Sequence, residues 1–179
     1  MSTTVTGTMT ALDEERGSVR VEDVYDTDIH DLWQACTDPE RLARWIARVS
    51  GDLREGSTVE CVFTSTWTGP ARIDVCDAPH HLRLTQEPGT DDETELEAWL
   101  TTEGSRTRLV VEERGLPRGA LHFYGAGWQT HLEDLGRSLS GEGEVHPGGW
   151  SSQEASSHWK ARWDELTPQY EGREVAPAG

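Results

Sequence analysis

Cysteine and long apolar runs are both scarce in this chain of 179 residues. The three cysteines, Cys36, Cys61 and Cys76, show no CxxC spacing, which argues against a disulfide framework and is typical of a reducing compartment. No stretch approaches the roughly 18 consecutive apolar residues of a membrane-spanning helix. Residues 1–11 lack the basic start and the apolar run of a signal peptide. We therefore expect a cytoplasmic protein.

Positive charge is scarce as well. Lysine and arginine total 16 against 33 aspartate and glutamate residues, which gives a formal net charge of -17. A field of this sign repels phosphate backbones and anionic lipid surfaces, so we expect neither a nucleic acid nor a membrane as partner. We interpret the excess of acid as a source of solubility.

The sequence also lacks the common motifs of catalytic and metal sites. It contains no GxSxG elbow, no HExxH or HxxxH spacing and no P-loop lysine, so it predicts no nucleophilic, zinc or phosphate-binding site. The adjacent His80 and His81 point to opposite faces of a strand. We interpret the acidic runs 91–93 and 112–113 as solvated charge. We therefore predict no catalytic residues, no metal and no cofactor, and a binding protein more than an enzyme.

Apolar periodicity predicts one strand and two short helices at the start of the chain. Valines alternate with polar residues over 16–25, which is typical of a strand with one buried face. Asp28 is suited to cap a helix whose apolar residues recur at helical spacing up to Cys36. The TDPE segment at 37–40 combines a cap, a proline at the first helical position and an acidic first turn, so it predicts the second helix.

Strand patterns fill the middle of the chain, and helical patterns follow. Short alternating runs from 58 to about 111 predict an antiparallel meander with one wet face. The first run spans 58–67, and the Gly-Pro pair at 69–70 marks the turn after it. A strong amphipathic pattern then predicts a long helix over 120–139.

The C-terminal residues predict a linker and a further helix. Residues 140–150 are rich in glycine and read as a flexible connector. The last helix is predicted to begin at Ser151, where Glu154 completes a capping box, and to end before Pro168. A helix this short needs a partner for its apolar face, so it docks on its own domain as a lid or pairs with a second chain. The docking residues are predicted to be Trp159, Trp163 and Leu166.

This order predicts an α+β helix-grip fold, in which a curved antiparallel sheet wraps around the long C-terminal helix. Two short helices follow the first strand, and an extra tail helix follows the long helix. We divide the chain into an N-terminal extension at 1–15, one domain at 16–140, and a linker with the amphipathic tail helix at 141–179.

Four segments resemble the START-like, or SRPBCC, superfamily in order and spacing. They are the helix pair DLWQACTDPERLARW at 31–45, the turn GDLREG at 51–56, the hairpin GSRTRL at 104–109 and the helix start GWQTHLEDL at 127–135. Within the superfamily, roughly residues 7–139 are similar to the activator of the heat-shock protein ninety ATPase. The resemblance implies the helix-grip fold, and its members include ligand-binding modules, stress-associated proteins and, more distantly, polyketide cyclases and lipid carriers.

A curved sheet around a helix encloses a concave apolar interior, where small ligands bind. We therefore expect this chain to bind a small hydrophobic or aromatic molecule without catalysis. One alternative is a cyclase- or hydrolase-like enzyme that uses a polar residue such as His131 or Asp74 in the pocket. Another is a stress-related or chaperone-associated interaction module, and a homodimer or a protein partner is also left open. The candidate pocket residues are Trp45, Phe63, Trp67, Leu84, Tyr124, Trp128 and His131. The alternative interpretation is that most of these side chains simply pack in the core.

Overall fold

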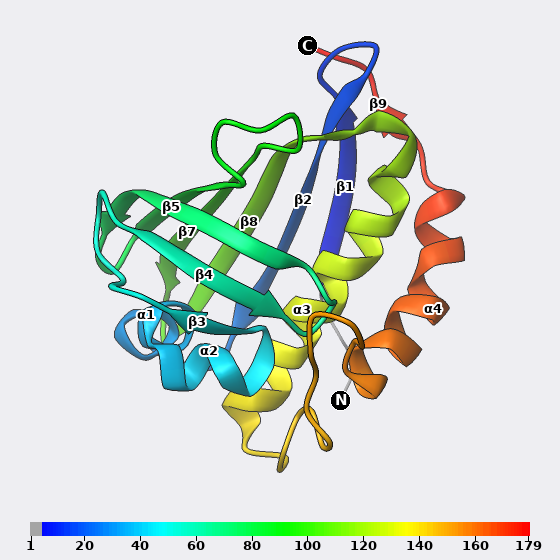
Figure 1. The fold of residues 1–179 in the computed structure, drawn as a ribbon. Coiled ribbons are helices and arrows are strands. Elements are labelled where there is room, and N and C mark those ends of the chain that lie inside the picture. The colour runs from blue at the N-terminus through cyan, green and yellow to red at the C-terminus, as the bar shows by residue number, and fades with distance from the viewer. Residues whose placement is uncertain (1–4) are drawn as a thin grey trace.

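A nine-stranded sheet curves around one long helix (Figure 1). The computed structural model describes residues 5–179. The strand order is β3-β4-β5-β6-β7-β8-β2-β1-β9, and neighbours are antiparallel except for the parallel pair β1 and β9. The strands are β1 (Thr6–Ala11), β2 (Arg16–Tyr25), β3 (Ala47–Ser50), β4 (Thr58–Phe63), β5 (Thr68–Asp77), β6 (His81–Gln86), β7 (Thr94–Glu103), β8 (Arg106–Pro117) and β9 (Val175–Ala176).

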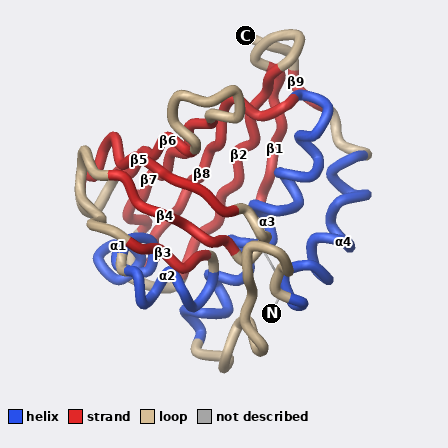
Figure 2. The backbone as a smooth tube through the Cα atoms, viewed as in Figure 1, coloured by secondary structure: helices blue, strands red, loops and turns tan. Residues whose placement is uncertain are grey.

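Four α-helices accompany the sheet. The long helix α3 lies along its concave face, and α4 runs beside α3 (Figure 2). The short helices α1 and α2 lie near β3, at one end of the sheet (Figure 1). The predicted α+β helix-grip fold is therefore confirmed. The helices are α1 (Ile29–Thr37), α2 (Pro39–Trp45), α3 (Leu121–Ser140) and α4 (Ser157–Glu171), and a 3-10 turn, η1 (Arg118–Ala120), leads into α3.

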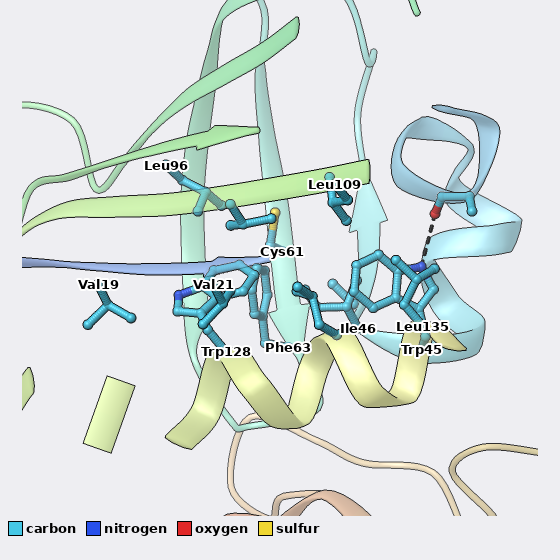
Figure 3. Packing of buried hydrophobic residues seen from close by; sticks show 14 of the residues in the cluster. Val19, Val21, Trp45, Ile46, Cys61, Phe63, Leu96, Leu109, Trp128 and Leu135 are labelled. Carbon is cyan, nitrogen blue, oxygen red and sulfur yellow. Dashed lines mark hydrogen bonds between the residues drawn. The ribbon is translucent and has the colours of Figure 1, made fainter. Parts of the chain in front are cut away.

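The core fills the space between the sheet and α3 (Figure 3). Val19 and Val21 of β2 face inward and are buried, because successive residues of a strand point to opposite faces. Leu109 and Val111 of β8 repeat this pattern, and Leu135 of α3 is buried opposite them. Each fully buried aliphatic side chain of this kind stabilises the fold by about 2 kcal/mol.

The two short helices begin at the caps that the sequence predicts. The Asp28 carboxylate accepts hydrogen bonds from the backbone N–H groups of His30 and Asp31, at 2.9 and 3.0 Å. Asp38 caps α2, whose first residue is Pro39. These bonds satisfy donors that have no partner within the helix.

The predicted N-terminal extension contributes a strand to the sheet. Residues 1–4 of this extension lie outside the described residues, but Thr6–Ala11 forms β1 and pairs with β2. The two short helices therefore follow the second strand and not the first. Met9 and Ala11 face the core. The sequence did not predict this strand because small residues and threonines surround them. Gly7 lies beneath the Tyr170 ring, where a Cβ would be 1.9 Å from the hydroxyl oxygen.

The predicted strand over 58–67 is too long. β4 ends at Phe63, and residues 64–67 form the turn into β5. The Gly-Pro pair at 69–70 lies within β5 and pairs with Cys61 and Glu60 of β4. Pro70 lies just beyond the last β5–β6 pair, Ala71 with Gln86, at a strand end where proline is tolerated, and its carbonyl accepts a bond from the backbone N–H of Glu87 at 2.9 Å.

The glycine-rich segment after α3 is anchored to the domain through His146. The imidazole is buried, with its Nε2 2.9 Å from the carbonyl oxygen of Trp45 and its Nδ1 2.6 Å from the hydroxyl of Ser156. One neutral tautomer satisfies both bonds, because Nε2–H donates and Nδ1 accepts. The indole of Trp150 adds a bond to the carbonyl of Val62, at 3.0 Å. The second half of the predicted flexible connector is therefore held against the domain.

The tail helix begins and ends later than the sequence predicts. The hydroxyl of Ser151 does accept bonds from the backbone N–H groups of Gln153 and Glu154, but it closes only a local turn. The chain then bonds to the β4–β5 turn through the N–H of Ser156 and the carbonyl of Thr64, and α4 starts after that bond. Pro168 lies inside α4 and does not stop it.

Helix α4 packs closely on α3 because α3 carries glycine at the contact. A Cβ on Gly125 would lie 2.5 Å from the Tyr170 ring, and one on Gly127 would lie 3.4 Å from the Trp159 ring. Tyr170 is fully buried, and its hydroxyl donates to Gln129 Oε1 at 2.7 Å. The tail helix is thus a packed part of the domain.

Candidate ligand-binding site

An apolar cavity of about 120 Å³ lies between the sheet, α2 and α3. Trp45, Leu84, Phe63 and Trp128 from the predicted set line it. A cavity of about 150 Å³ holds one benzene ring, so this space is suited to a small group and not to a whole drug-sized ligand. All three cysteines of the chain line the same cavity, namely Cys36, Cys61 and Cys76.

A larger groove of about 1040 Å³ lies beside the cavity, between the β4–β5 turn, the N-terminal half of α3 and the start of α4. Trp67, Tyr124 and His131 from the predicted set line this groove. Trp159 and Trp163 of the tail helix line it as well. The structure therefore divides the predicted pocket residues between two neighbouring hollows.

Phe63, Gln86 and Trp128 line both hollows and separate them. Phe63 and Trp128 point into the space between the sheet and α3 (Figure 3). Phe63 packs edge-on against Trp67, with ring centroids 5.2 Å apart.

Glu113 of β8 lies at the floor of the groove, where sequence reasoning placed solvated charge. Its side chain is only 6% exposed, and burial raises its pKa. The indole N–H of Trp128 donates to Glu113 Oε2 at 2.6 Å, and the Thr94 hydroxyl lies 2.9 Å from Oε1. The signal was present in the alternation of β8, since Leu109, Val111 and Glu113 share the inward face.

His131 is a neutral member of an aromatic cluster. Its ring centroid lies 5.3 Å from that of Trp128, 5.5 Å from Trp159 and 5.8 Å from Phe63. Burial lowers its pKa to about 3. The nearest polar contact is between Nδ1 and the Thr64 hydroxyl, at 3.5 Å. His131 is therefore a buried, neutral part of the aromatic groove wall.

The two polar residues of the enzyme alternative do not come together. Asp74 lines neither hollow. Its carboxylate accepts from the Arg72 guanidinium at 2.6 Å and from the Thr85 hydroxyl at 2.5 Å, and these bonds lower its pKa although burial opposes the shift. His131, by contrast, lies under α4.

The cysteines of the inner cavity are neutral thiols. Burial raises the pKa of Cys36 to about 12 and that of Cys61 to about 11, and it also raises the pKa of Cys76. A thiol of this kind behaves as a small apolar group. Among residues 5–179, no three His, Cys, Asp or Glu side chains gather in a way that would hold a metal ion.

The tail helix supplies one wall of the groove. Trp159 and Leu166 are buried, and the ring of Trp163 stacks on Phe123 with centroids 5.6 Å apart. The indole N–H of Trp163 also donates to the Phe123 carbonyl at 2.9 Å. The buried indole N–H of Trp159 has no hydrogen-bond partner among the described residues. Such orphaned donors are rare in native structures.

Residues 26–140 match the model of the family described as Activator of Hsp90 ATPase homolog 1-like protein. None of the described helices is long and apolar enough to cross a membrane. No curated protein matches the sequence.

Solved structures share this fold. The crystal structure of CalU16 from Micromonospora echinospora is 24% identical, has a TM-score of 0.71, and the match covers 94% of this chain and 97% of that one. A protein from Bordetella parapertussis is 22% identical over 88% of this chain and 86% of that one, with a TM-score of 0.66. DynU16, from the dynemicin biosynthetic locus, is 23% identical over 72% of this chain and 49% of that one, with a TM-score of 0.66.

Proposed function

Because the chain belongs to the family of Activator of Hsp90 ATPase homolog 1-like proteins, we propose that it binds a small hydrophobic or aromatic molecule and does not change it chemically. The observation that carries this proposal is the aromatic groove beside the apolar cavity. Ligand sites are mostly apolar hollows of about 300–1,000 Å³ with a few placed polar groups. The groove has that size and character, and Glu113 and His131 are its buried polar groups.

The two hollows suggest how a ligand divides between them. The flat body lies in the groove against Trp67 and Tyr124, and one ring or branched alkyl group enters the inner cavity past Phe63 and Trp128. Aromatic side chains contribute large contact areas and lose little conformational entropy on binding. Helix α4 closes one side of the groove and excludes water from the ligand.

Native mass spectrometry of the protein purified from its own cells tests the proposal first. The expected result is an added mass of a few hundred daltons, roughly the size that such a hollow holds. Organic extraction then releases a compound that absorbs or partitions as an apolar molecule. Protein that carries no added mass, and that also fails to bind the probe described next, contradicts the proposal.

A variant at the groove wall gives the second test. Tyr124 is 38% exposed and lines the groove, whereas Leu12 is 44% exposed and lies elsewhere. The neutral fluorescent probe N-phenyl-1-naphthylamine is expected to bind the wild type. Tyr124→Ala weakens this binding about tenfold, the loss of about 1.4 kcal/mol expected for one aromatic contact. Leu12→Ala leaves it unchanged, and equal effects of the two variants would place the probe outside the groove.

The cyclase- or hydrolase-like alternative requires two ionisable groups in hydrogen-bond contact within the groove. Glu113 is bonded to Trp128 and Thr94, and His131 approaches Thr64. These partners hold each group in place without making an acid–base pair. Ligand binding is therefore the function that the geometry supports best.

A further inference from the structure

The groove combines aromatic walls with an excess of carboxyl groups. Five acidic side chains and two basic ones line it. One of the basic groups, Lys160, is bonded to Asp164 at 2.7 and 2.8 Å. The other, Arg16, donates to the backbone carbonyls of Gly115 and Asp91. The remaining acidic residues of the groove are Glu87, Asp92, Glu113 and Glu154.

Glu113 is the carboxyl group at the floor of the groove, and both of its hydrogen-bond donors are neutral. Trp128 and Thr94 supply these bonds, and Glu113 forms no ion pair with a Lys or Arg side chain of residues 5–179. Burial without a counter-charge disfavours the ionised carboxylate, and a cation beside it would stabilise that form. The groove is the open side from which that charge can arrive.

The aromatic wall already accommodates a cation at its rim. The ammonium group of Lys160 lies 5.3 Å from the centre of the Trp163 ring. The negative faces of indole rings attract cations, and aromatic cages bind quaternary ammonium groups in this way. The formal charge of -17 adds a long-range field that draws cations toward the molecule.

We propose that the ligand of this groove is an organic cation, with an apolar or aromatic body between the Trp67 and Tyr124 walls and its positive group beside Glu113. This inference rests on the proposed function and adds the charge class of the ligand. Glu113 acts as the specificity-determining residue, since its carboxylate attracts a cation and offers no such interaction to a neutral ligand of the same shape. An anionic ligand meets repulsion from the acidic lining.

A pair of isosteric probes tests the charge directly. Trimethyl(2-phenylethyl)ammonium and (3,3-dimethylbutyl)benzene have the same shape and differ by N⁺ against carbon. Each displaces N-phenyl-1-naphthylamine from the wild-type protein in a competition titration. The cation is expected to bind at least about tenfold more tightly than the neutral isostere, as one desolvated cation–aromatic and carboxylate contact allows.

Two matched variants locate the effect. Glu113→Gln removes the charge but keeps an acceptor for Trp128, and it is expected to abolish the preference for the cation while neutral binding persists. Glu112→Gln removes the same charge from the neighbouring residue, which pairs with Arg20 at 3.6 Å and Arg114 at 3.4 Å. This variant is expected to keep the preference. Circular dichroism verifies that both variants are folded.

The outcomes separate this inference from the proposed function. If the neutral isostere binds the wild type as tightly as the cation, or if Glu112→Gln and Glu113→Gln lose the preference equally, the cationic class is wrong while ligand binding stands. If neither isostere displaces the naphthylamine, the cationic class is also wrong. Failure of the naphthylamine itself to bind contradicts the proposed function as well. The wild-type comparison needs no variant, so misfolding of a variant does not remove the test.

Discussion

Burial changes the protonation of two single histidines in this protein. His131 lies among aromatic rings, and His146 holds the linker through Trp45 and Ser156. Burial lowers their pKa values from 6.5 to about 3 and about 4. Both are therefore neutral in the folded protein over the range in which an unfolded chain takes up protons. Asp134 shows the opposite shift, because burial raises its pKa to about 8.

The shift at His131 predicts a specific dependence of stability on pH. A lowered histidine pKa gives stability that is present above pH 6.5 and is lost as the pH falls toward the folded value of about 3. Between pH 7.5 and 4.5 the wild type should lose on the order of 2 kcal/mol more unfolding free energy than His131→Gln. Urea unfolding at the two pH values measures this difference.

A packing variant at the same cluster provides the control for this prediction. Phe63→Leu alters the ring contact to His131, 5.8 Å between centroids, but leaves the histidine in place. It should keep the pH dependence of the wild type. Equal pH dependence in the wild type and His131→Gln would mean that the imidazole is charged in the fold, contrary to its burial.

At the scale of elements, glycine in α3 determines how closely α4 can pack against it. A residue with a side chain at 125 would collide with the Tyr170 ring, whereas a Cβ at Gly136 of the same helix would lie 3.7 Å from Tyr25. That second distance is ordinary van der Waals contact. The two glycines therefore have the same effect on helix propensity and opposite effects on packing.

This contrast makes a paired prediction. Gly136→Ala should stabilise the protein by up to about 1 kcal/mol, because alanine is the better helix former and fits there. Gly125→Ala should destabilise it by about 2 kcal/mol, because the overlap with Tyr170 outweighs the same gain in propensity. Thermal and urea unfolding of the two variants measure these changes. A stabilising effect of Gly125→Ala would show that α4 does not press on α3 at this point.

The tail completes the domain at the scale of the whole molecule. Leu166 and Tyr170 are buried against α3, β9 pairs with β1, and Trp159 closes the groove. Association of α4 with its own domain is therefore the arrangement in this structure. If α4 paired with a second chain instead, it would first have to leave its own domain and expose the glycine-containing face of α3.

Truncation tests this role of the tail. Deletion of residues 150–179 should lower the midpoint of thermal unfolding by roughly 10 °C or more, since several kcal/mol of apolar burial are lost. It should also promote self-association through the uncovered face of α3. Deletion of 172–179 removes β9 and leaves α4 in place, and should cost far less. Calorimetry and analytical ultracentrifugation measure both effects, and a monomeric, equally stable 1–149 fragment would contradict them.

The sequence alone determined the order of the elements and the fold class. Alternating valines gave β2 at its observed bounds, and Asp28 and Asp38 marked the starts of α1 and α2. These features depend on local periodicity and capping, which a short stretch of chain contains in full. The long amphipathic helix was predicted for the same reason.

Only the tertiary structure decided which residues line the groove, where the tail helix packs and that Glu113 is buried. Helix α4 begins after the hydrogen bond between residues 64 and 156, and Tyr170 at its C-terminal end packs on Gly7 and Gly125. These contacts join residues that are far apart in the sequence. Glu113 looks like any other acid in an acidic chain until Trp128, fifteen residues later, covers it. Local pattern does not encode which distant side chain supplies a hydrogen bond or removes water, and those contacts set both burial and charge.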